Sequence, residues 1–140
     1  MENITFYKFA NSFFFVFHVA LIFFNLFGWA PRSLRKWNLI TLLLTAISWF
    51  GLGICYGFGY CFLTDWHWQI RNKLGYATDS NSYIHFLITE LMPLSIGEAV
   101  VDVWTAILFF LALAVSIALN MRDRQRHTSG KRKVPGKALK

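Results

Sequence analysis

Three long apolar stretches dominate the pattern of hydrophobic and polar positions along the chain. They cover residues 9–29, 37–58 and 103–119, and they contain almost no charged side chains. An α-helix rises about 1.5 Å per residue, so each stretch has roughly the length needed to cross a ~30 Å hydrocarbon layer. The pattern therefore predicts three transmembrane helices.

Polar and small side chains recur within each stretch at spacings of three, four or seven residues, which places them on one face of a helix. The stripes are Asn11, His18 and Asn25 in the first stretch, Thr41, Thr45, Ser48 and Cys55 in the second, and Asp102, Thr105, Ala112, Ser116 and Asn120 along the third. Lipid offers no hydrogen bonds to these side chains. We therefore expect the three stripes to face one another in a compact bundle.

The segment after the second stretch is rich in aromatic and polar residues and predicts a short amphipathic helix. Thr64 or Asp65 can cap the start of this helix, and Gly75 is a natural stop after Leu74. Trp66 on its apolar face favours the membrane–water boundary, because the indole ring is apolar and its N–H needs a partner. We expect this helix to lie on the outer membrane surface.

A second short helix is predicted at residues 83–91, started by Asn81 or Ser82 and ended or bent by Pro93. The predicted fold class is thus an all-α membrane protein with three transmembrane helices and two short amphipathic surface helices between the second and third. Residues 1–121 form a single three-span domain, and residues 122–140 form a basic disordered cytoplasmic tail, because this tail has too few apolar side chains to fold.

The basic residues are unevenly distributed along a chain that is 56% hydrophobic and carries a net charge of +7. Eight of the 14 Lys and Arg follow Asn120, and Arg32, Arg35 and Lys36 lie between the first two stretches. Basic segments stay on the cytoplasmic side during insertion. We therefore expect an outside N-terminus and a cytoplasmic C-terminus whose charges associate with anionic lipid rather than with nucleic acid.

Several side chains could carry chemistry, and together they form the candidate functional cluster. Its members are His18, Cys61, Thr64, Asp65, His67, Arg71 and His85. No catalytic residue and no metal site is assigned, because Cys61, Asp65 and His67 match no standard zinc spacing. His18 lies in mid-span, where it could serve a proton relay, a haem or a quinone. The simpler interpretation is a neutral ring that hydrogen-bonds Ser48 or Thr45.

The glycines and cysteines at the end of the second stretch allow two further interpretations. Gly53 and Gly57 have the small-xxx-small spacing that lets two helices approach closely, although glycines can also loosen a helix. Cys55 and Cys61 are six positions apart, which is about 9 Å on an unbroken helix and too far for a disulfide. A disulfide between them requires the chain to fold back near Gly57 and Gly59.

The order of these features resembles an uncharacterised family of small bacterial membrane proteins, domain of unknown function 2784, over roughly residues 10–121. The matching features are His18, the basic residues 32–36, the motif Cys61-Phe62-Leu63-Thr64, the pair Ile70-Arg71 and the segment Tyr83-Ile84-His85-Phe86. Phe62 replaces the usual Pro, and His67 stands where a Glu is common. The Glu would complete a capping box with Thr64, which is a structural role. The resemblance implies membrane location and architecture, and it brings no activity, substrate or cofactor.

Three functions follow as hypotheses. The first is a non-enzymatic accessory or assembly component of the bacterial inner membrane, with the lipid bilayer and either another membrane protein or a second copy as partners and with no cofactor. The second is a redox or haem/quinone protein that uses His18 and the outer Cys61/His67 cluster. The third and weakest is a membrane-embedded hydrolase or transferase that uses the acid–base groups between the second and third stretches.

Overall fold

The computed structural model describes residues 3–56, 60–76, 80–92 and 94–132, and these residues form helices and no strand. In chain order the elements are α1 (Ile4–Phe27), α2 (Arg35–Ala46), the π-helical segment η1 (Ile47–Leu52), α3 (Gly53–Tyr56), α4 (Phe62–Lys73), α5 (Tyr83–Leu91) and α6 (Glu98–Arg132). The predicted all-α fold class is confirmed.

Three helical segments are long and apolar enough to cross a membrane: Ile4–Phe27, Arg35–Tyr56 and Glu98–Ser129. They correspond to the three apolar stretches, and each begins earlier in the chain than the sequence pattern indicated. The predicted end of the second stretch at Phe58, and with it Gly57 and Gly59, lies outside the described residues, so the Gly53–Gly57 packing motif stays a prediction.

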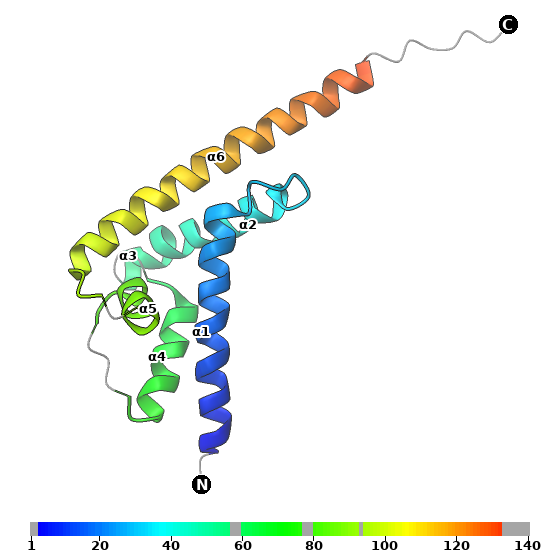
Figure 1. The fold of residues 1–140 in the computed structure, drawn as a ribbon. Coiled ribbons are helices and arrows are strands. Elements are labelled where there is room, and N and C mark those ends of the chain that lie inside the picture. The colour runs from blue at the N-terminus through cyan, green and yellow to red at the C-terminus, as the bar shows by residue number, and fades with distance from the viewer. Residues whose placement is uncertain (1–2, 57–59, 77–79, 93, 133–140) are drawn as a thin grey trace, which may run out of the picture.

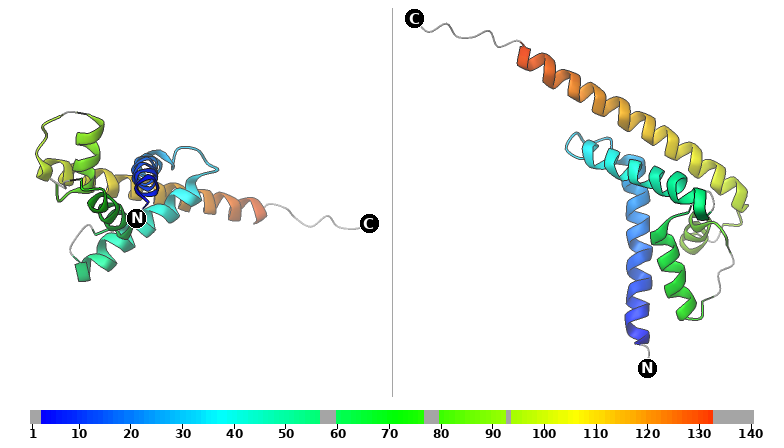
Figure 2. Two further views of the ribbon diagram at one scale, coloured as in Figure 1. Left: turned by 90° about the horizontal axis from the view of Figure 1, so that it is seen from below. Right: turned by 180° about the vertical axis from the view of Figure 1, so that it is seen from behind.

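The three long segments do not form the compact bundle that we expected. α2 and α6 lie side by side, whereas α1 crosses them at a wide angle near its C-terminal end (Figures 1 and 2). α4 packs along the N-terminal half of α1. The polar residues of α1 explain this arrangement, because Asn25 bonds Thr45 of α2 while Asn11 bonds His67 of α4. The stripe on α1 is thus shared between two different neighbours.

The apolar core lies where α1, α2 and α6 meet. Leu42, Phe109 and Ala112 are buried there, and the Trp49 ring packs on the Phe109 ring at 4.8 Å between centroids. Most other apolar side chains of the three segments remain exposed, for example Leu44 at 60% and Leu111 at 58%. Such exposure is expected for helices that face lipid, because hydrocarbon chains solvate these side chains as well as a protein core does.

The second segment widens into the π-helix η1 midway along its length. Ser48 is buried at this point, and its hydroxyl donates to the carbonyl oxygen of Tyr60 at 3.1 Å. This bond holds the chain after α3 against the middle of the segment, so that α4 begins beside α1 rather than beyond the end of the second span.

The two short helices between the second and third segments exist as predicted, with one corrected boundary. α4 begins at Phe62 after Cys61, which lacks a side-chain capping bond, so the expected caps Thr64 and Asp65 lie inside the helix. α4 ends before Gly75, whose φ of 74° favours glycine. α5 covers the predicted residues, and the Ser82 hydroxyl caps it by accepting from the His85 N–H. Pro93 lies outside the described residues.

α6 continues through Arg132, although the sequence predicted no folded structure after residue 121. Extending an existing helix is easier than starting one, because nucleation has already occurred in the apolar part of α6. The Thr128 hydroxyl donates back to the carbonyl oxygens of Arg124 and Gln125 within this extension. Residues 133–140 lie outside the described part of the chain.

Gly28 allows the end of α1 to approach α2. A Cβ at this position would lie 2.5 Å from the Phe24 carbonyl oxygen and 3.0 Å from Nδ2 of Asn38. The Asn38 side chain is buried, and its Nδ2 donates to the carbonyl oxygens of Phe24 and Asn25.

We expect Gly28→Ala to lower the free energy of unfolding by about 1–3 kcal/mol, because the added methyl overpacks this contact. Gly51→Ala is the matched control, since a Cβ there would meet only Ile47 at an ordinary 3.7 Å. Thermal unfolding of both variants in mild detergent measures the difference. Equal unfolding temperatures for the two variants would contradict the close approach at Gly28.

Candidate functional site

A group of polar side chains that includes the buried His18 and His67 lies between α1, α4 and α5. We call them the histidine cluster, which consists of Asn11, His18, Cys61, His67 and Tyr83. α4 runs antiparallel to α1, so that Cys61 at its start lies beside His18 and the Lys73 ammonium at its end donates to the Tyr7 hydroxyl. α5 contributes Tyr83 from its first turn.

His67 is fully buried and both of its ring nitrogens are hydrogen-bonded. The side-chain amide oxygen Oδ1 of Asn11 can only accept, so Nε2 of His67 donates to it at 3.0 Å. Nδ1 of His67 accepts from the Tyr83 hydroxyl at 2.6 Å. Burial, with His18 and Arg71 nearby, lowers the pKa of His67 to about 4. Burial also raises the pKa of Tyr83. His67 is therefore a neutral ring that joins α4 to α1 and α5.

His18 is 5% exposed and does not make the contacts that the sequence suggested. Its Nδ1–H donates to the Phe14 carbonyl oxygen at 2.7 Å, and its ring lies 4.6 Å from the Tyr83 ring. Ser48 bonds Tyr60 and Thr45 bonds Asn25 and Thr41, so the proposed links from His18 to Ser48 or Thr45 are wrong. The Nε2 atom of His18 is buried with no hydrogen bond to any described residue.

Cys61 is partly buried at the N-terminus of α4 and keeps a free thiol, as does the exposed Cys55. Burial raises the pKa of the Cys61 thiol, but the His18 ring and hydrogen-bond donors at Thr64 and Leu63 outweigh it and lower this pKa to about 7. A thiol at a helix N-terminus beside a histidine is the environment in which thiolates become accessible near neutral pH.

Arg71 lies at the edge of the histidine cluster and is held by aromatic rings. Its guanidinium carbon is 4.3 Å from the centroid of Phe86 and 5.3 Å from that of Tyr76, close enough for cation–π attraction. A Glu90 carboxylate oxygen lies 3.7 Å from one of its terminal nitrogens. An open polar pocket of about 550 Å³ lies beside Arg71, lined also by Asn11, Gly75, Tyr76 and Glu90.

The structure brings together only part of the predicted cluster. His18, Cys61, Thr64, His67 and Arg71 lie close to one another. Asp65 instead accepts from Gln69 on the exposed side of α4, and His85 contacts Ser80 and the Ile96 carbonyl oxygen in the connections around α5. Tyr83 was not predicted as a member, and nothing in its spacing along the chain indicated that its hydroxyl bonds His67. The spacing of seven residues did place Asn11 on the same face of the first helix as His18, and this was the one sequence feature that indicated a role for Asn11.

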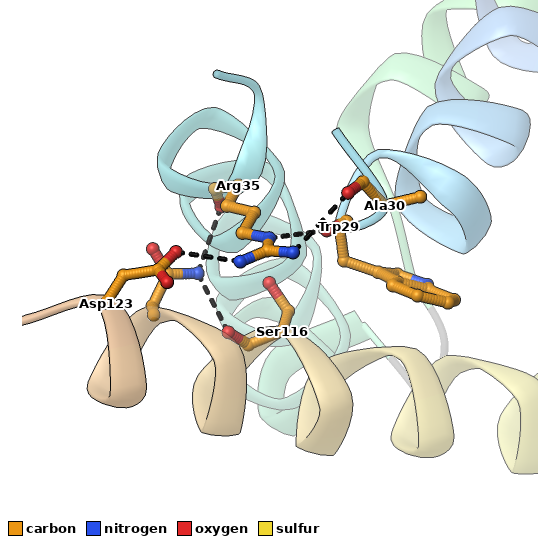
Figure 3. A network of polar contacts seen from close by, with 6 residues as sticks. Trp29, Ala30, Arg35, Ser116 and Asp123 are labelled. Carbon is orange, nitrogen blue, oxygen red and sulfur yellow. Dashed lines mark hydrogen bonds and ion pairs between the residues drawn. The ribbon is translucent and has the colours of Figure 1, made fainter. Parts of the chain in front are cut away.

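A second polar network, which the sequence did not indicate, joins the first loop to α6 (Figure 3). Arg35 is 8% exposed and donates from Nε to the Trp29 carbonyl oxygen at 2.9 Å and from Nη1 to Asp123 at 2.9 Å. The Asn120 amide donates to the Arg35 carbonyl oxygen at 3.1 Å. This network, the arginine clamp, fixes the start of α2 to the C-terminal part of α6.

The described residues contain no group of three or more His, Cys, Asp or Glu side chains that could hold a metal ion together. The histidine cluster contains a partly buried thiol, a buried imidazole with one unbonded nitrogen, and a second histidine whose two nitrogens are both hydrogen-bonded.

We expect the stability of the protein to depend on pH through His67. An unfolded histidine has a pKa of about 6.5, so below this pH the unfolded chain binds a proton that folded His67 does not take up until about pH 4. The free energy of unfolding should fall as the pH drops from about 6.5 to 4, by at most about 1.4 kcal/mol per pH unit from this group. Thermal unfolding between pH 7.5 and 4.5 measures the slope, and His67→Gln should flatten it. An equal slope in both proteins would contradict the assignment.

A family model described as Protein of Unknown function (DUF2784) matches residues 8–121, which include the histidine cluster and Arg35. No curated protein and no solved structure matches the chain.

Proposed function

Since this chain belongs to the DUF2784 family, whose description gives no activity, we propose that it is a small integral protein of the bacterial inner membrane that acts as a non-enzymatic accessory or assembly component. The observation that carries the proposal is the exposed apolar surface of the three long helices. Such an apolar surface is suited to contact with lipid, and one face of it could also pack against a partner protein.

The exposed surface is large relative to the core. Only 17%, 11% and 22% of the residues in the most apolar windows of Ile4–Phe27, Arg35–Tyr56 and Glu98–Ser129 are buried. Three helices that bury so little against one another gain little from their mutual packing. Association with a second membrane protein, or with another copy of this chain, would bury more of the surface through van der Waals contact.

The arginine clamp supports the proposed orientation. The contact between Arg35 and Asp123 joins the basic first loop to the basic part of α6, so both lie at the same end of the molecule. The bond from Lys73 to the Tyr7 hydroxyl joins the N-terminus to the end of α4 at the opposite end. Because basic segments are retained in the cytoplasm, we infer an outside N-terminus and a cytoplasmic C-terminus.

The redox alternative gains no support from the histidine cluster. Both ring nitrogens of His67 already have protein partners, so this ring is not free to ligate a haem iron. His18 has one unbonded ring nitrogen, Nε2, and the histidine cluster offers no second unbonded histidine nitrogen to pair with it.

Cysteine labelling tests the orientation. In a background that carries Cys55→Ser and Cys61→Ser, Asn81→Cys and Ser129→Cys place single probe thiols at two exposed positions, one between α4 and α5 and one near the end of α6. A membrane-impermeant maleimide should modify the first in intact cells and the second only after the membrane is permeabilised. The reverse pattern would overturn the orientation.

The accessory role is tested by isolating the protein from native membranes in a mild detergent and measuring its mass by native mass spectrometry. We expect a discrete complex with a second copy or with a stoichiometric membrane protein. A photo-reactive residue at the exposed Trp104 should cross-link to that partner, and one at Gln125 beyond the apolar part of α6 should not. A strictly monomeric protein that cross-links to lipid alone would contradict the proposal.

A further inference from the structure

The open polar pocket of about 550 Å³ beside Arg71 is built by three helices and one turn. Asn11 lines it from α1, Arg71 from α4 and Glu90 from α5, and these helices lie next to one another (Figure 1). Gly75 and Tyr76 line it from the turn that ends α4. This turn closes because Gly75 adopts a φ of 74°, so that the Tyr76 N–H donates back to the Arg71 carbonyl oxygen at 3.1 Å.

Arg71 is a nearly buried charge whose hydrogen-bond donors are poorly satisfied. Its side chain is 12% exposed, and its Nε–H is buried with no acceptor among the described residues. Oε1 of Glu90 lies 3.7 Å from Nη2, which is longer than a hydrogen bond. Phe86 and Trp68 attract the charge through their rings, but a ring offers no oxygen acceptor. A buried charge in this state costs free energy, and a bound anionic group would offset that cost.

Asn11 supplies a second donor to the same pocket. Its amide oxygen Oδ1 accepts from Nε2 of His67, so the NH₂ group is the end of the amide that remains for a ligand. His67 is fully buried and fixes the amide in this orientation. A guanidinium group matches the paired oxygens of a phosphate, and an amide NH₂ beside it can donate to the same group.

Glu90 determines which kind of phosphate compound fits. Its side chain is 50% exposed, and its carboxylate lies beside Arg71 at the rim of the pocket. A ligand that carries negative charge alone is repelled by this carboxylate while Arg71 attracts it. A ligand with an ammonium group a few bonds from its phosphate can place one charge on each side chain, and its ammonium N–H groups can donate to Glu90. The pocket is therefore suited to a zwitterion.

The position of the pocket along α1 indicates the source of such a group. Asn11 lies two positions after Phe9, where the apolar stretch begins, and Lys73, two positions after Arg71, bonds the Tyr7 hydroxyl ahead of that stretch. In a membrane-spanning α1 this is the level at which the chain passes from the polar headgroups to the hydrocarbon layer. The phosphates of phospholipids lie at that level.

We propose that this pocket binds a phosphoethanolamine group, with the phosphate on Arg71 and on Nδ2 of Asn11 and the ammonium group on Glu90. The headgroup of phosphatidylethanolamine and a soluble phosphoethanolamine ester share this chemistry, and the level of the pocket favours the lipid. The site is independent of whether the protein is a subunit of a larger complex.

The first arm of the test uses the full-length protein in mild detergent with equal amounts of dioleoyl phosphatidylethanolamine, phosphatidylglycerol and phosphatidylcholine. Native mass spectrometry measures which lipid stays bound. We expect phosphatidylethanolamine to be retained about tenfold more than the other two, because only its headgroup donates a charge-assisted hydrogen bond to Glu90. Arg71→Gln should abolish this preference. Arg32→Gln, which removes an exposed arginine from the first loop, should leave it unchanged.

The second arm distinguishes the two sources. Isothermal titration of the delipidated protein with glycerophosphoethanolamine measures binding of the headgroup without its hydrocarbon chains. Selective retention of the lipid without binding of this compound identifies phosphatidylethanolamine as the ligand, and binding of the compound that Arg71→Gln abolishes identifies a soluble ester. Absence of both the lipid preference and this binding, or either result undiminished in Arg71→Gln, would overturn the proposal.

Glu90→Gln keeps the proposal testable even where loss of Arg71 weakens the fold, because the Glu90 side chain is half exposed. This variant should unfold at the temperature of the unmodified protein. It should retain phosphatidylethanolamine several-fold less and phosphatidylglycerol more, since the repulsion of a simple anion is gone, and any binding of glycerophosphoethanolamine should weaken equally. Unchanged selectivity for the ammonium-bearing ligand in Glu90→Gln would refute the assignment.

Discussion

Replacing His67 by alanine is expected to lower the free energy of unfolding by about 3–5 kcal/mol, the largest effect of any single substitution in the described part of the chain. The ring is 0% exposed and lies 5.9 Å from the Phe14 ring and 5.7 Å from the Tyr83 ring, so its removal opens a cavity between three helices. The Tyr83 hydroxyl and the side-chain amide oxygen Oδ1 of Asn11 also lose their partner. Denaturant or thermal unfolding in mild detergent measures the loss.

Two further variants separate packing from hydrogen bonding at this position. His67→Phe fills the space but leaves the two polar groups unpaired, and it should cost about 1–3 kcal/mol. Gln69→Ala, on the exposed side of the same helix, should change the stability by no more than about 0.5 kcal/mol. If His67→Ala were as mild as Gln69→Ala, α4 would not pack on α1 through His67.

The second large effect is expected at the arginine clamp. Arg35→Ala removes charged hydrogen bonds to the Trp29 and Ala30 carbonyl oxygens and to Asp123, and it should lower the free energy of unfolding by about 3 kcal/mol. This loss of stability is small for a broken ion pair, because the Asp123 side chain is 31% exposed and water can solvate its carboxylate once Arg35 is removed. The variant should also release the first loop from α6. Longer cross-linking distances between the loop and α6, or faster proteolysis of the loop, would show this release.

Lys36→Ala is the matched control for the clamp. Lys36 is exposed and adjacent to Arg35, so its loss removes the same charge from the same turn of α2 without breaking a buried contact. It should change the stability by no more than about 0.5 kcal/mol. Arg35→Lys should recover only part of the loss, since an ammonium group cannot present donors in the planar fork that reaches two carbonyls and a carboxylate. Equal losses in Arg35→Ala and Lys36→Ala would show that the charge, and not the clamp, matters.

The cases of His67 and Arg35 show how far sequence patterns reach in this protein. His67 and Arg71 are four positions apart and therefore lie on one face of α4, but this spacing did not reveal that the face turns toward α1. Arg35 was interpreted only as an orientation signal in the first loop. Its partner Asp123 lies 88 positions later, and no local pattern links two such distant residues. His18 was recognised as unusual, but its expected partners on the second span were wrong.

The amino-acid sequence by itself indicated the three long helices and the two short helices between the second and third, although not all of their ends. Long apolar runs must satisfy their backbone groups internally in lipid, so three such runs become three helices. The positions of Gly75 and Ser82 set helix boundaries through local chain geometry. Only the tertiary structure decided which helices meet. The crossing of α1 over α2 and α6, the enclosure of His67 by α1, α4 and α5, and the approach of His18 to Cys61 depend on contacts between residues far apart in the chain. Such contacts depend on which polar groups of different helices become hydrogen-bond partners. Helical periodicity within one segment does not predict the partner in another segment.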